Sequence, residues 1–515
     1  MIRAKRWLFL LHRWLGVIVC AFFAMWFVSG VVMMYVGYPK LTAAERLQHL
    51  PALDAAAPVL SPMQALDKAG IHGPLQDLRL AMASGGRAVY LAVPARDPKA
   101  AGAGRRRPPP GAGTVVIDAG TGAVLRAFDR DSILASAAAF AGAGRSVNYE
   151  GAIQEDAFTH SRGLDAHRPL HVVQLGDVDH TRLYVSGTTG EVVRDATRTE
   201  RVWNYAGAWI HWLYPFRGNV LNPYWTDIVN WLSVLGIAVT VIGTVVGILR
   251  WRFMRTYKSG SHSPYKGFMM RWHHITGLLF AVVTFTWIFS GLMSMSPWGI
   301  FDNGAPSLRI QAMNAGQLAM TGREASPQTL LAAAGPDVRE LRWTLSDGQT
   351  LVLASGSAGR SAVLDAGTAA AHVPDPVALK AAAARLLPSA VARVDVLNNY
   401  DMYYYSRDAH TMTGGSEKPL PIWRVVFDDS HATWVHIDPA TGAVLGRTDS
   451  TQRVKRWVFA MLHSWDWLPL LERRPIWDIL MILLSLGGTA LSVTGVVIGW
   501  RRLGLKFASL KARSA

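Results

Sequence analysis

Four of the 16 histidines in this 515-residue chain occupy matching positions of an internal repeat. His12 matches His273 at an offset of 261 residues, and His211 matches His463 at an offset of 252 residues. Each of the four lies at the end of an apolar stretch or in an aromatic-rich segment beside one. Histidine is costly near hydrocarbon and usually marks a site there. These four side chains are therefore the first candidates for chemistry.

His12 and His273 are each followed four residues later by a glycine, Gly16 and Gly277, within LHRWLG and RWHHITG. Residues four apart lie on the same face of a helix. This spacing places a ligand nitrogen beside a patch without a side chain, which the edge of a flat porphyrin requires. The other two histidines lie in WIHWLYP and LHSWDWLP, and such aromatic segments are typical of a membrane interface.

Histidine pairs that face each other would suit haem b. In two halves related by a pseudo-two-fold axis, His12 lies opposite His273 and His211 lies opposite His463. Ligation by two neutral imidazoles suits low-spin haem b and leaves no coordination position for oxygen, so its natural role is electron transfer. We therefore expect two haem b groups per chain, with these four histidines as the ligands of the haem iron.

Two alternatives stay open for these histidines. All four could instead be interfacial side chains that bond to lipid headgroups or to backbone carbonyls. His274 is adjacent to His273 and could replace it as a ligand, although the repeat offset favours His273. The histidines of the outer regions that have no partner in the repeat are expected to serve surface or core packing.

The single cysteine, Cys20, lies inside an apolar run. One cysteine cannot form an intramolecular disulfide, hold an iron–sulfur cluster, make a CxxC redox motif or attach a c-type haem. The short segments between the spans contain no GxGxxG fingerprint for flavin or nicotinamide. Any redox cofactor must therefore be bound without a covalent link, and its electron must come from an external donor.

Four apolar stretches without a charged side chain are long enough to cross about 30 Å of hydrocarbon at about 1.5 Å per residue. They are Trp14 to Val36, Ile228 to Leu249, Ile275 to Ile300 and Ile479 to Trp500. The first is too long for the apolar core of a signal peptide and has no A-x-A site after it, so we expect it to be retained. Four spans place both chain ends on the same side of the membrane, with membrane lipid as the immediate partner.

A set of lysine and arginine residues flanks these stretches on one side and supplies nearly all of the formal charge of +16. The basic residues concerned, with no Asp or Glu among them, are Arg3, Lys5, Arg6, Arg13, Arg250, Arg252, Arg255, Lys258, Lys266, Arg271, Arg501, Arg502, Lys506, Lys511 and Arg513. This is the positive-inside pattern, which removes the case for a nucleic-acid partner. Both termini and the middle loop are thus expected in the cytoplasm.

The predicted fold class is an α-helical membrane protein with four transmembrane helices in two tandem repeats, plus two extracytoplasmic α+β domains. The expected boundaries are 1–37, 227–250, 272–300 and 475–501 for the transmembrane helices, 38–226 and 301–474 for the outer regions with their interfacial helices, 251–271 for the cytoplasmic loop and 502–515 for the cytoplasmic tail. Both halves begin in the cytoplasm, so the repeats are parallel and their axis runs roughly along the membrane normal.

The outer regions are predicted to consist of repeated α+β units, in which a short helix precedes a hairpin with a T-G turn. Copies of the hairpin occur at Val115–Leu125, Leu183–Val193, Val363–Val373 and Thr433–Leu445. Glycine in the turn can take a positive φ. The run 95–113, which contains RRRPPP, is expected to be a flexible insert in the first unit.

Two glycine pairs, Gly243/Gly247 and Gly495/Gly499, occupy matching positions in the second and fourth spans. The G-x-x-x-G spacing allows close approach of a second helix, and a porphyrin could use the same space. Both interpretations stay open.

The order of these motifs resembles the PepSY-associated transmembrane family of bacterial inner-membrane proteins. The resemblance extends over nearly the whole chain and rests on LHRWLG, the T-G hairpins, HWLYPF, YDMYYYSRD at 400–408, PLPIWRVVFDD, RVKRWVFAMLHSWDW, RRPIWDI and TGVVIGWRR. It implies PepSY-like outer domains that lie in the periplasm. Some members are haem-containing ferric-siderophore reductases, so the resemblance also implies reduction of a chelated iron at the periplasmic face, with the motif histidines as haem ligands.

Two functions are therefore open. In the first, a quinol or a cytoplasmic reductase gives electrons to haem near His12 and His273, and haem near His211 and His463 passes them to a ferric siderophore or similar chelate. In the second, the chain is a non-redox PepSY scaffold or a metal or proton transporter. A transporter needs ionisable groups near the middle of the spans, and these spans contain none there, which favours the first function.

Side chains of the second outer region are candidates for lining a cleft in which the chelate docks. They are Tyr403, Tyr404, Tyr405 and Arg424. Ordinary strand packing is the alternative interpretation of the same residues.

Overall fold

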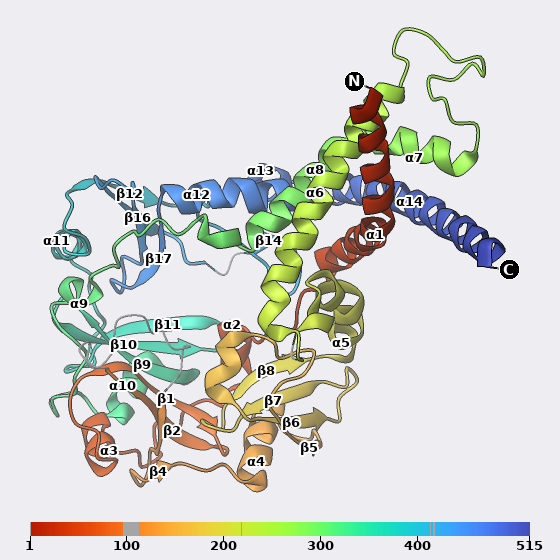
Figure 1. Cartoon of the computed structure of the whole chain (residues 1–515). Helices are drawn as coiled ribbons and strands as arrows, with labels where there is room; N and C mark the ends of the chain where they lie inside the picture. The colour runs from red at the N-terminus through yellow and green to blue at the C-terminus, as the bar shows by residue number, and fades with distance from the viewer. Residues whose placement is uncertain (1, 96–112, 218, 413, 416–417, 515) are drawn as a thin grey trace.

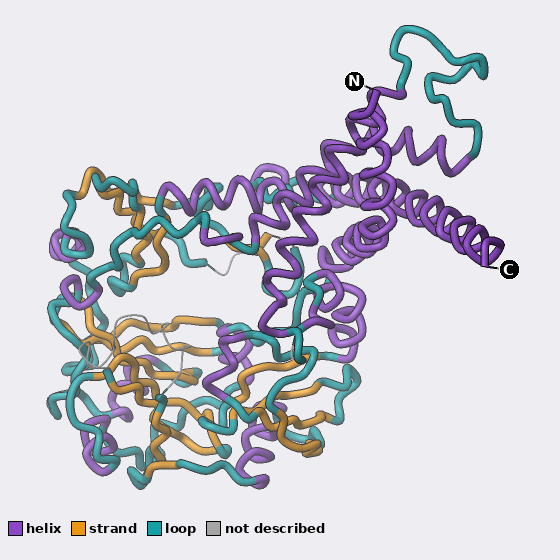
Figure 2. Tube along the Cα trace, viewed as in Figure 1, coloured by secondary structure: helices purple, strands orange, loops and turns teal. Residues whose placement is uncertain are grey.

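The computed structural model describes residues 2–95, 113–217, 219–412, 414–415 and 418–514. Long helices form one end of the molecule and sheets form the other (Figures 1 and 2). The RRRPPP insert that we expected to be flexible lies outside the described residues.

The helical end contains three helices that are long and apolar enough to cross a membrane: α1 (Ile2–Tyr35), α6 (Trp225–Arg250) and α14 (Ile476–Ser514). A fourth candidate is the pair α7 (Phe268–Leu279) and α8 (Ala281–Ser294), which are bent by 67° relative to each other. The described part of the chain therefore has three spans, or four if the bent pair is one span.

The bend between α7 and α8 differs from the unbroken span that we expected over 272–300. Phe280 leaves helical geometry, with a φ of −103° and a ψ of 13°. Its ring lies against Gly487 of α14, where an added Cβ atom would come within 2.1 Å of the ring. The bend thus accompanies the seating of one aromatic ring on a glycine of the neighbouring helix, a contact that the apolar pattern of the segment does not indicate.

Both ends of the described chain lie at the end of the helical part that is farthest from the sheets (Figure 1). The loop 251–267, which joins α6 to α7, lies at the same end. The basic flanking segments therefore gather on one side of the spans and the sheets on the other, which is the arrangement that the positive-inside pattern predicts.

The long helices pack into one bundle. Helix α1 contacts α6 and α14, α6 contacts α8, and α7 contacts α14. Between α1, α6 and α8 lies an apolar cluster of side chains that are at most 8% exposed: Val19, Phe23, Phe27, Val239 and Ile288. Small residues allow close approach here, because a Cβ atom at Gly236 would lie 2.9 Å from the Phe23 ring.

One sheet contains strands from both outer regions. Its order is β11–β10–β9–β1–β2–β3–β4. Strand β1 (Leu75–Ser84) pairs antiparallel with β9 (Val338–Ser346), and the fully buried Leu80 lies opposite the fully buried Leu341. We expected two outer domains, and the pairing of β1 with β9 satisfies a strand edge of each region. The two outer regions are therefore joined.

The other elements complete the outer end. The joined sheet also contains β2 (Arg87–Pro94), β3 (Val115–Asp118), β4 (Val124–Leu125), β10 (Gln349–Gly356) and β11 (Gly359–Asp365). A four-stranded sheet of the first region contains β5 (Val147–Ile153), β6 (Leu170–Leu175), β7 (Arg182–Ser186) and β8 (Val192–Ala196). A four-stranded sheet of the second region contains β12 (Val391–Leu397), β15 (Ile422–Phe427), β16 (Trp434–Ile437) and β17 (Val444–Thr448). A two-stranded sheet is formed by β13 (Ser406–Arg407) and β14 (Gly414–Gly415). The shorter helices are α2 (Ala43–His49), α3 (Pro62–Lys68), α4 (Arg130–Ala141), α5 (Arg198–Asn204), α9 (Ile310–Met313), α10 (Pro327–Ala334), α11 (Pro376–Ala384), α12 (Ser450–Arg456) and α13 (Leu468–Leu471).

All four T-G hairpins are present, at the turns that follow β3, β7, β11 and β16. In the first, the Asp118 carboxylate accepts hydrogen bonds from the backbone N–H groups of Gly120 and Thr121 at 3.1 and 2.9 Å. Gly122 then takes a φ of 80°, and Ala369 takes the same place in the third hairpin with a φ of 57°. The third copy keeps its turn because Asp365 makes the equivalent carboxylate contacts.

Candidate functional site

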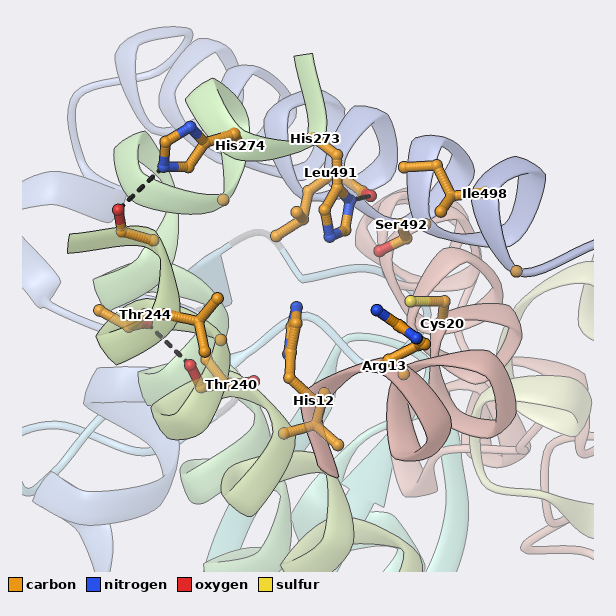
Figure 3. A pocket seen from close by; sticks show the side chains of 18 of the residues that line it. His12, Arg13, Cys20, Thr240, Thr244, His273, His274, Leu491, Ser492 and Ile498 are labelled. Atoms are coloured by element: carbon orange, nitrogen blue, oxygen red, sulfur yellow. Dashed lines mark hydrogen bonds between the residues drawn. The ribbon is translucent and has the colours of Figure 1, made fainter. Parts of the chain in front are cut away.

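The inner histidine pair consists of His12 on α1 and His273 on α7. Their ring centroids lie 6.1 Å apart, with an angle of 35° between the ring planes. Figure 3 shows the two side chains pointing towards each other across an open space. Both are partly exposed. The fold thus brings together two residues that only the repeat offset connects in the sequence.

A cavity of about 310 Å³ lies between these two rings. Gly16 and Gly277 line it, and no heavy atom lies within 4 Å of the place that a Cβ atom would take at Gly16. Arg13 and Arg502 also line the cavity and give its wall two guanidinium groups. The space beside His12 is therefore open to a flat group, as the H-x-x-x-G spacing predicts.

Hydrogen bonds leave one nitrogen of His273 available to a metal. Its Nδ1 lies 3.2 Å from the carbonyl oxygen of Leu491 and 3.3 Å from Oγ1 of Thr494, so it carries the proton. Its Nε2 has no hydrogen bond to any residue that the structure describes. A histidine that donates from one nitrogen presents the other as a neutral ligand. In His12, Nδ1 is buried and has no hydrogen-bond partner within the described ranges.

Glycines of the second and fourth spans lie directly against the two inner rings. A Cβ atom at Gly243 would lie 2.5 Å from Cε1 of His12, and one at Gly495 would lie 3.2 Å from Cε1 of His273. The second glycine of each G-x-x-x-G pair instead lies against an aliphatic side chain of a neighbouring helix. Each pair therefore serves both a histidine ring and a helix contact.

His274 has no nitrogen left for a metal. Its Nδ1 is 2.8 Å from Oγ of Ser263, and its Nε2 donates to the carbonyl oxygen of Gly247 at 2.9 Å. The side chain is buried, at 7% exposed. Of the two adjacent histidines, the geometry therefore favours His273.

The outer pair consists of His211 and His463. Their ring centroids are also 6.1 Å apart, with an angle of 75° between the ring planes. Each histidine follows a π-helical turn, Tyr205–Trp209 or Trp457–Met461, and the two turns occupy matching positions at the offset of 252. Such turns are rare and are frequent at functional sites. They were not expected from the sequence.

Serines of α1 and α8 support the outer rings. Oγ of Ser29 lies 2.9 Å from Nδ1 of His211, and Oγ of Ser290 lies 3.1 Å from Nδ1 of His463. Nδ1 of His463 also donates to the carbonyl oxygen of Trp287 at 3.1 Å. Both Nδ1 atoms are thus engaged, while neither Nε2 makes a hydrogen bond to a described residue.

The separation within each pair suits one metal between two imidazoles. With metal–nitrogen distances of about 2 Å, and about 1 Å from each nitrogen to its ring centre, two rings on one metal have centres about 6 Å apart. Among the described residues, no group of three or more His, Cys, Asp or Glu side chains could hold a metal ion. Two facing histidines fit haem, because the porphyrin supplies the other ligands of the iron.

The side chains that we considered for a docking cleft make internal contacts. Tyr404 and Tyr405 are only 3% and 7% exposed, and their hydroxyls donate to a backbone carbonyl and to a buried carboxylate. The Arg424 guanidinium is 2.7 Å from the carboxylate of Asp401. Packing, the alternative interpretation, accounts for these three residues.

An ionic contact between the two outer regions was missed in the sequence. The His410 ring lies 2.6 Å from the Glu45 carboxylate and 3.2 Å from that of Glu200. Hydrogen bonds to Glu200 and then Glu45 raise the pKa of His410 to about 10. Burial alone would raise the pKa of Glu45, but its hydrogen bonds with His410 and Thr42 outweigh that effect and lower the pKa to about 2. Residues so far apart in the chain leave no local pattern that would predict the contact.

Comparison with known proteins identifies a family. A family model described as the PepSY-associated TM region matches residues 9–356, which is more than half of the chain. The match includes His12, His211 and His273 and ends before His463. No curated protein matches the chain.

Proposed function

The chain belongs to the PepSY-associated transmembrane family, and on this premise we propose that it is a haem-b-containing electron-transfer protein of the bacterial inner membrane. It reduces a ferric siderophore or similar iron chelate on the periplasmic side, which makes it a ferric-chelate reductase that aids iron release and uptake. It holds two haem b groups per chain and takes electrons from a quinol or a cytoplasmic reductase.

The matched geometry of the two histidine pairs carries this proposal. Both pairs have ring centroids 6.1 Å apart. In His273, His211 and His463, hydrogen bonds occupy Nδ1 and leave Nε2 for a metal. Interfacial histidines that only bond to headgroups or carbonyls have no need for this repeated arrangement. Four unrelated interfacial histidines would not account for two equal separations.

The chain's own residues position the two sites and keep water out of the space between them. When bound, haem b supplies a carrier for one electron at a time. Hydrogen bonds at Nδ1 set the tautomer and the orientation of each ligand ring. The apolar cluster around Phe23 and Phe27 separates the inner pair from the outer pair and excludes water.

Chemistry at the acceptor follows from the charge of the iron. One electron from the outer site converts the ferric ion of the chelate into a ferrous ion. Hard oxygen ligands prefer the ferric ion, so the chelate then holds its iron less tightly. The iron is the substrate in this reaction, and its chelate approaches the protein from the side of the outer regions.

Equivalent contacts in the two halves support four spans in two parallel tandem repeats. Nε1 of Trp225 donates to the carbonyl oxygen of Trp212 at 2.9 Å, and Nε1 of Trp477 donates to that of Ser464 at 3.1 Å. Both members of each contact are related by the offset of 252. In the proposed topology, both termini and the loop 251–271 are cytoplasmic and the sheets are periplasmic.

A reduced-minus-oxidised visible spectrum of the detergent-purified full chain tests the cofactor. Haem is counted as the pyridine haemochromogen in the wild type and in the His12→Ala and His463→Ala variants. The matched control is His274→Ala, which removes a neighbouring histidine whose nitrogens are both bonded. We expect low-spin b-type bands, two haems per chain in the wild type and the control, and one after each of the other substitutions.

Mixing the reduced protein anaerobically with a ferric trihydroxamate tests the reaction. The expected result is loss of the reduced haem bands together with the appearance of ferrous iron in a colorimetric trap. A colourless protein would end the redox proposal and favour a PepSY scaffold or a transporter; a coloured protein that ferric chelates do not oxidise would keep the haem and reject this acceptor.

A further inference from the structure

The guanidinium of Arg407 lies beside the outer histidine pair. Its Nη2 donates to Oγ of Ser464 at 3.0 Å and to the carbonyl oxygen of the same residue at 3.4 Å, and Ser464 directly follows His463. Its Nε donates to the Asp466 carboxylate at 2.8 Å. Only 16% of the Arg407 side chain is exposed, so water screens its charge weakly.

Positive charge exceeds negative charge in this cluster. Asp466 is only 7% exposed and also lies 3.4 Å from Nη2 of Arg456, so two guanidinium groups share one carboxylate. The Tyr405 hydroxyl, which donates to the same carboxylate, is neutral. Burial raises the pKa of Asp466 to about 7, so above that pH its carboxylate is ionised and cancels one of the two guanidinium charges. One unit of positive charge is therefore left over near His463.

Within its described residues, the first half of the chain has no equivalent cluster. At the offset of 252, Trp212 takes the place of Ser464 and Tyr214 takes the place of Asp466. Arg217 donates to the hydroxyl of Tyr214 at 3.1 Å, and among the described residues no guanidinium donates to the residue after His211. The charge acts on the outer pair through the His463 side alone.

We propose that Arg407 raises the redox potential of the outer haem site and that Asp466 limits this rise. The inference rests on the proposed function and adds the direction of electron transfer, from the inner site to the outer one. Reduction lowers the charge of a haem by one unit, and a buried positive charge beside its ligand favours the reduced form. A more positive potential at the outer site draws electrons outward from the inner one.

Redox titration of the outer site at pH 8, where Asp466 is ionised, tests this in the full-length protein. The His12→Ala background removes the inner haem, so that one midpoint potential is measured. Arg407→Gln is expected to shift that potential to a more negative value and Asp466→Asn to a more positive one. Arg407→Lys keeps the charge and is expected to restore most of the shift. Arg424→Gln is the matched control, because it removes another buried guanidinium of the same region, one that is paired with Asp401.

Opposite shifts in Arg407→Gln and Asp466→Asn support the inference, because a purely structural effect would move both potentials in the same direction. Shifts of the same sign, or no shift in a variant that keeps its haem, overturn it and leave the proposed function intact. A colourless parent protein overturns the proposed function and this inference with it.

Discussion

Gly243 and His12 are in direct contact across two helices, because a Cβ atom at residue 243 would lie 2.5 Å from Cε1 of the imidazole. Helix α6 carries the glycine and α1 carries the histidine. At 3.0 Å or less from ring atoms, no side chain can be added unless the ring moves. The orientation of the His12 ring thus depends on the absence of a methyl group on another helix.

Gly243→Ala is expected to displace the His12 ring and to remove the inner haem while the outer one stays. The haemochromogen assay should then give about half of the wild-type haem. Gly504→Ala is the matched control, because no heavy atom lies within 4 Å of the place that its Cβ atom would take. Full haem content in Gly243→Ala would contradict the assignment of His12 as a ligand.

Ser29→Ala is expected to weaken the outer site without abolishing it. The substitution removes the 2.9 Å hydrogen bond at Nδ1 of His211, and loss of such a supporting contact typically costs about 10- to 100-fold in metal affinity. The rate of haem transfer to an excess of apomyoglobin measures the effect. Ser233→Ala serves as the control, since the hydroxyl of this buried serine donates to the backbone carbonyl of Val229 in its own helix. Equal transfer rates in both variants would count against His211.

Alkaline pH is expected to weaken the contact between the outer regions. The pKa of His410 rises from its ordinary value of 6.5 to about 10, so the folded protein favours the protonated ring. The stabilisation is fully present below about pH 6.5 and is lost as the pH approaches 10. Thermal unfolding at pH 7 and pH 10 measures it: the wild type should lose more stability than His410→Gln, and the exposed-site control His72→Gln should follow the wild type. A parallel loss in His410→Gln would show that other groups cause the change.

Leu341→Ala is expected to destabilise both outer regions together. Leu341 is fully buried opposite Leu80 in the pairing of β1 with β9, and truncation of such a leucine costs about 2–5 kcal/mol. Limited proteolysis should reveal faster cleavage on both sides of the joined sheet. Val373→Ala, at a site that is 83% exposed, should leave the pattern unchanged. Faster cleavage confined to the second region would mean that the two regions unfold independently.

Patterns that depend on neighbouring residues were readable in the sequence. Apolar length predicted the membrane helices, because hydrocarbon imposes a minimum span. The turn positions predicted the hairpins, because one side chain fixes each turn, a carboxylate in the first and third copies and the Ser186 hydroxyl in the second. The repeat offsets brought His12 together with His273, although their role as ligands stays a prediction.

Features that depend on contacts between residues far apart in the chain could not be predicted from the sequence. The bend at Phe280 accompanies a contact with Gly487 on another helix. The pairing of β1 with β9 joins strands that are far apart in the sequence. The carboxylate partners of His410 and Arg407 lie far away in the sequence, so no periodic pattern predicts these contacts. The repeat offset favoured His273 over His274, but the sequence could not show the hydrogen bonds that occupy His274, because they come from a loop and from another helix.

The sheet that runs from β11 to β4 joins the two halves of the chain through the pairing of β1 with β9. A transporter with alternating access must rock one half against the other. Such a movement would have to break the pairing of β1 with β9. Transfer of an electron needs fixed distances and no such opening. Under the proposed function, an electron crosses the membrane while the iron stays outside, and the pairing of β1 with β9 stays intact throughout.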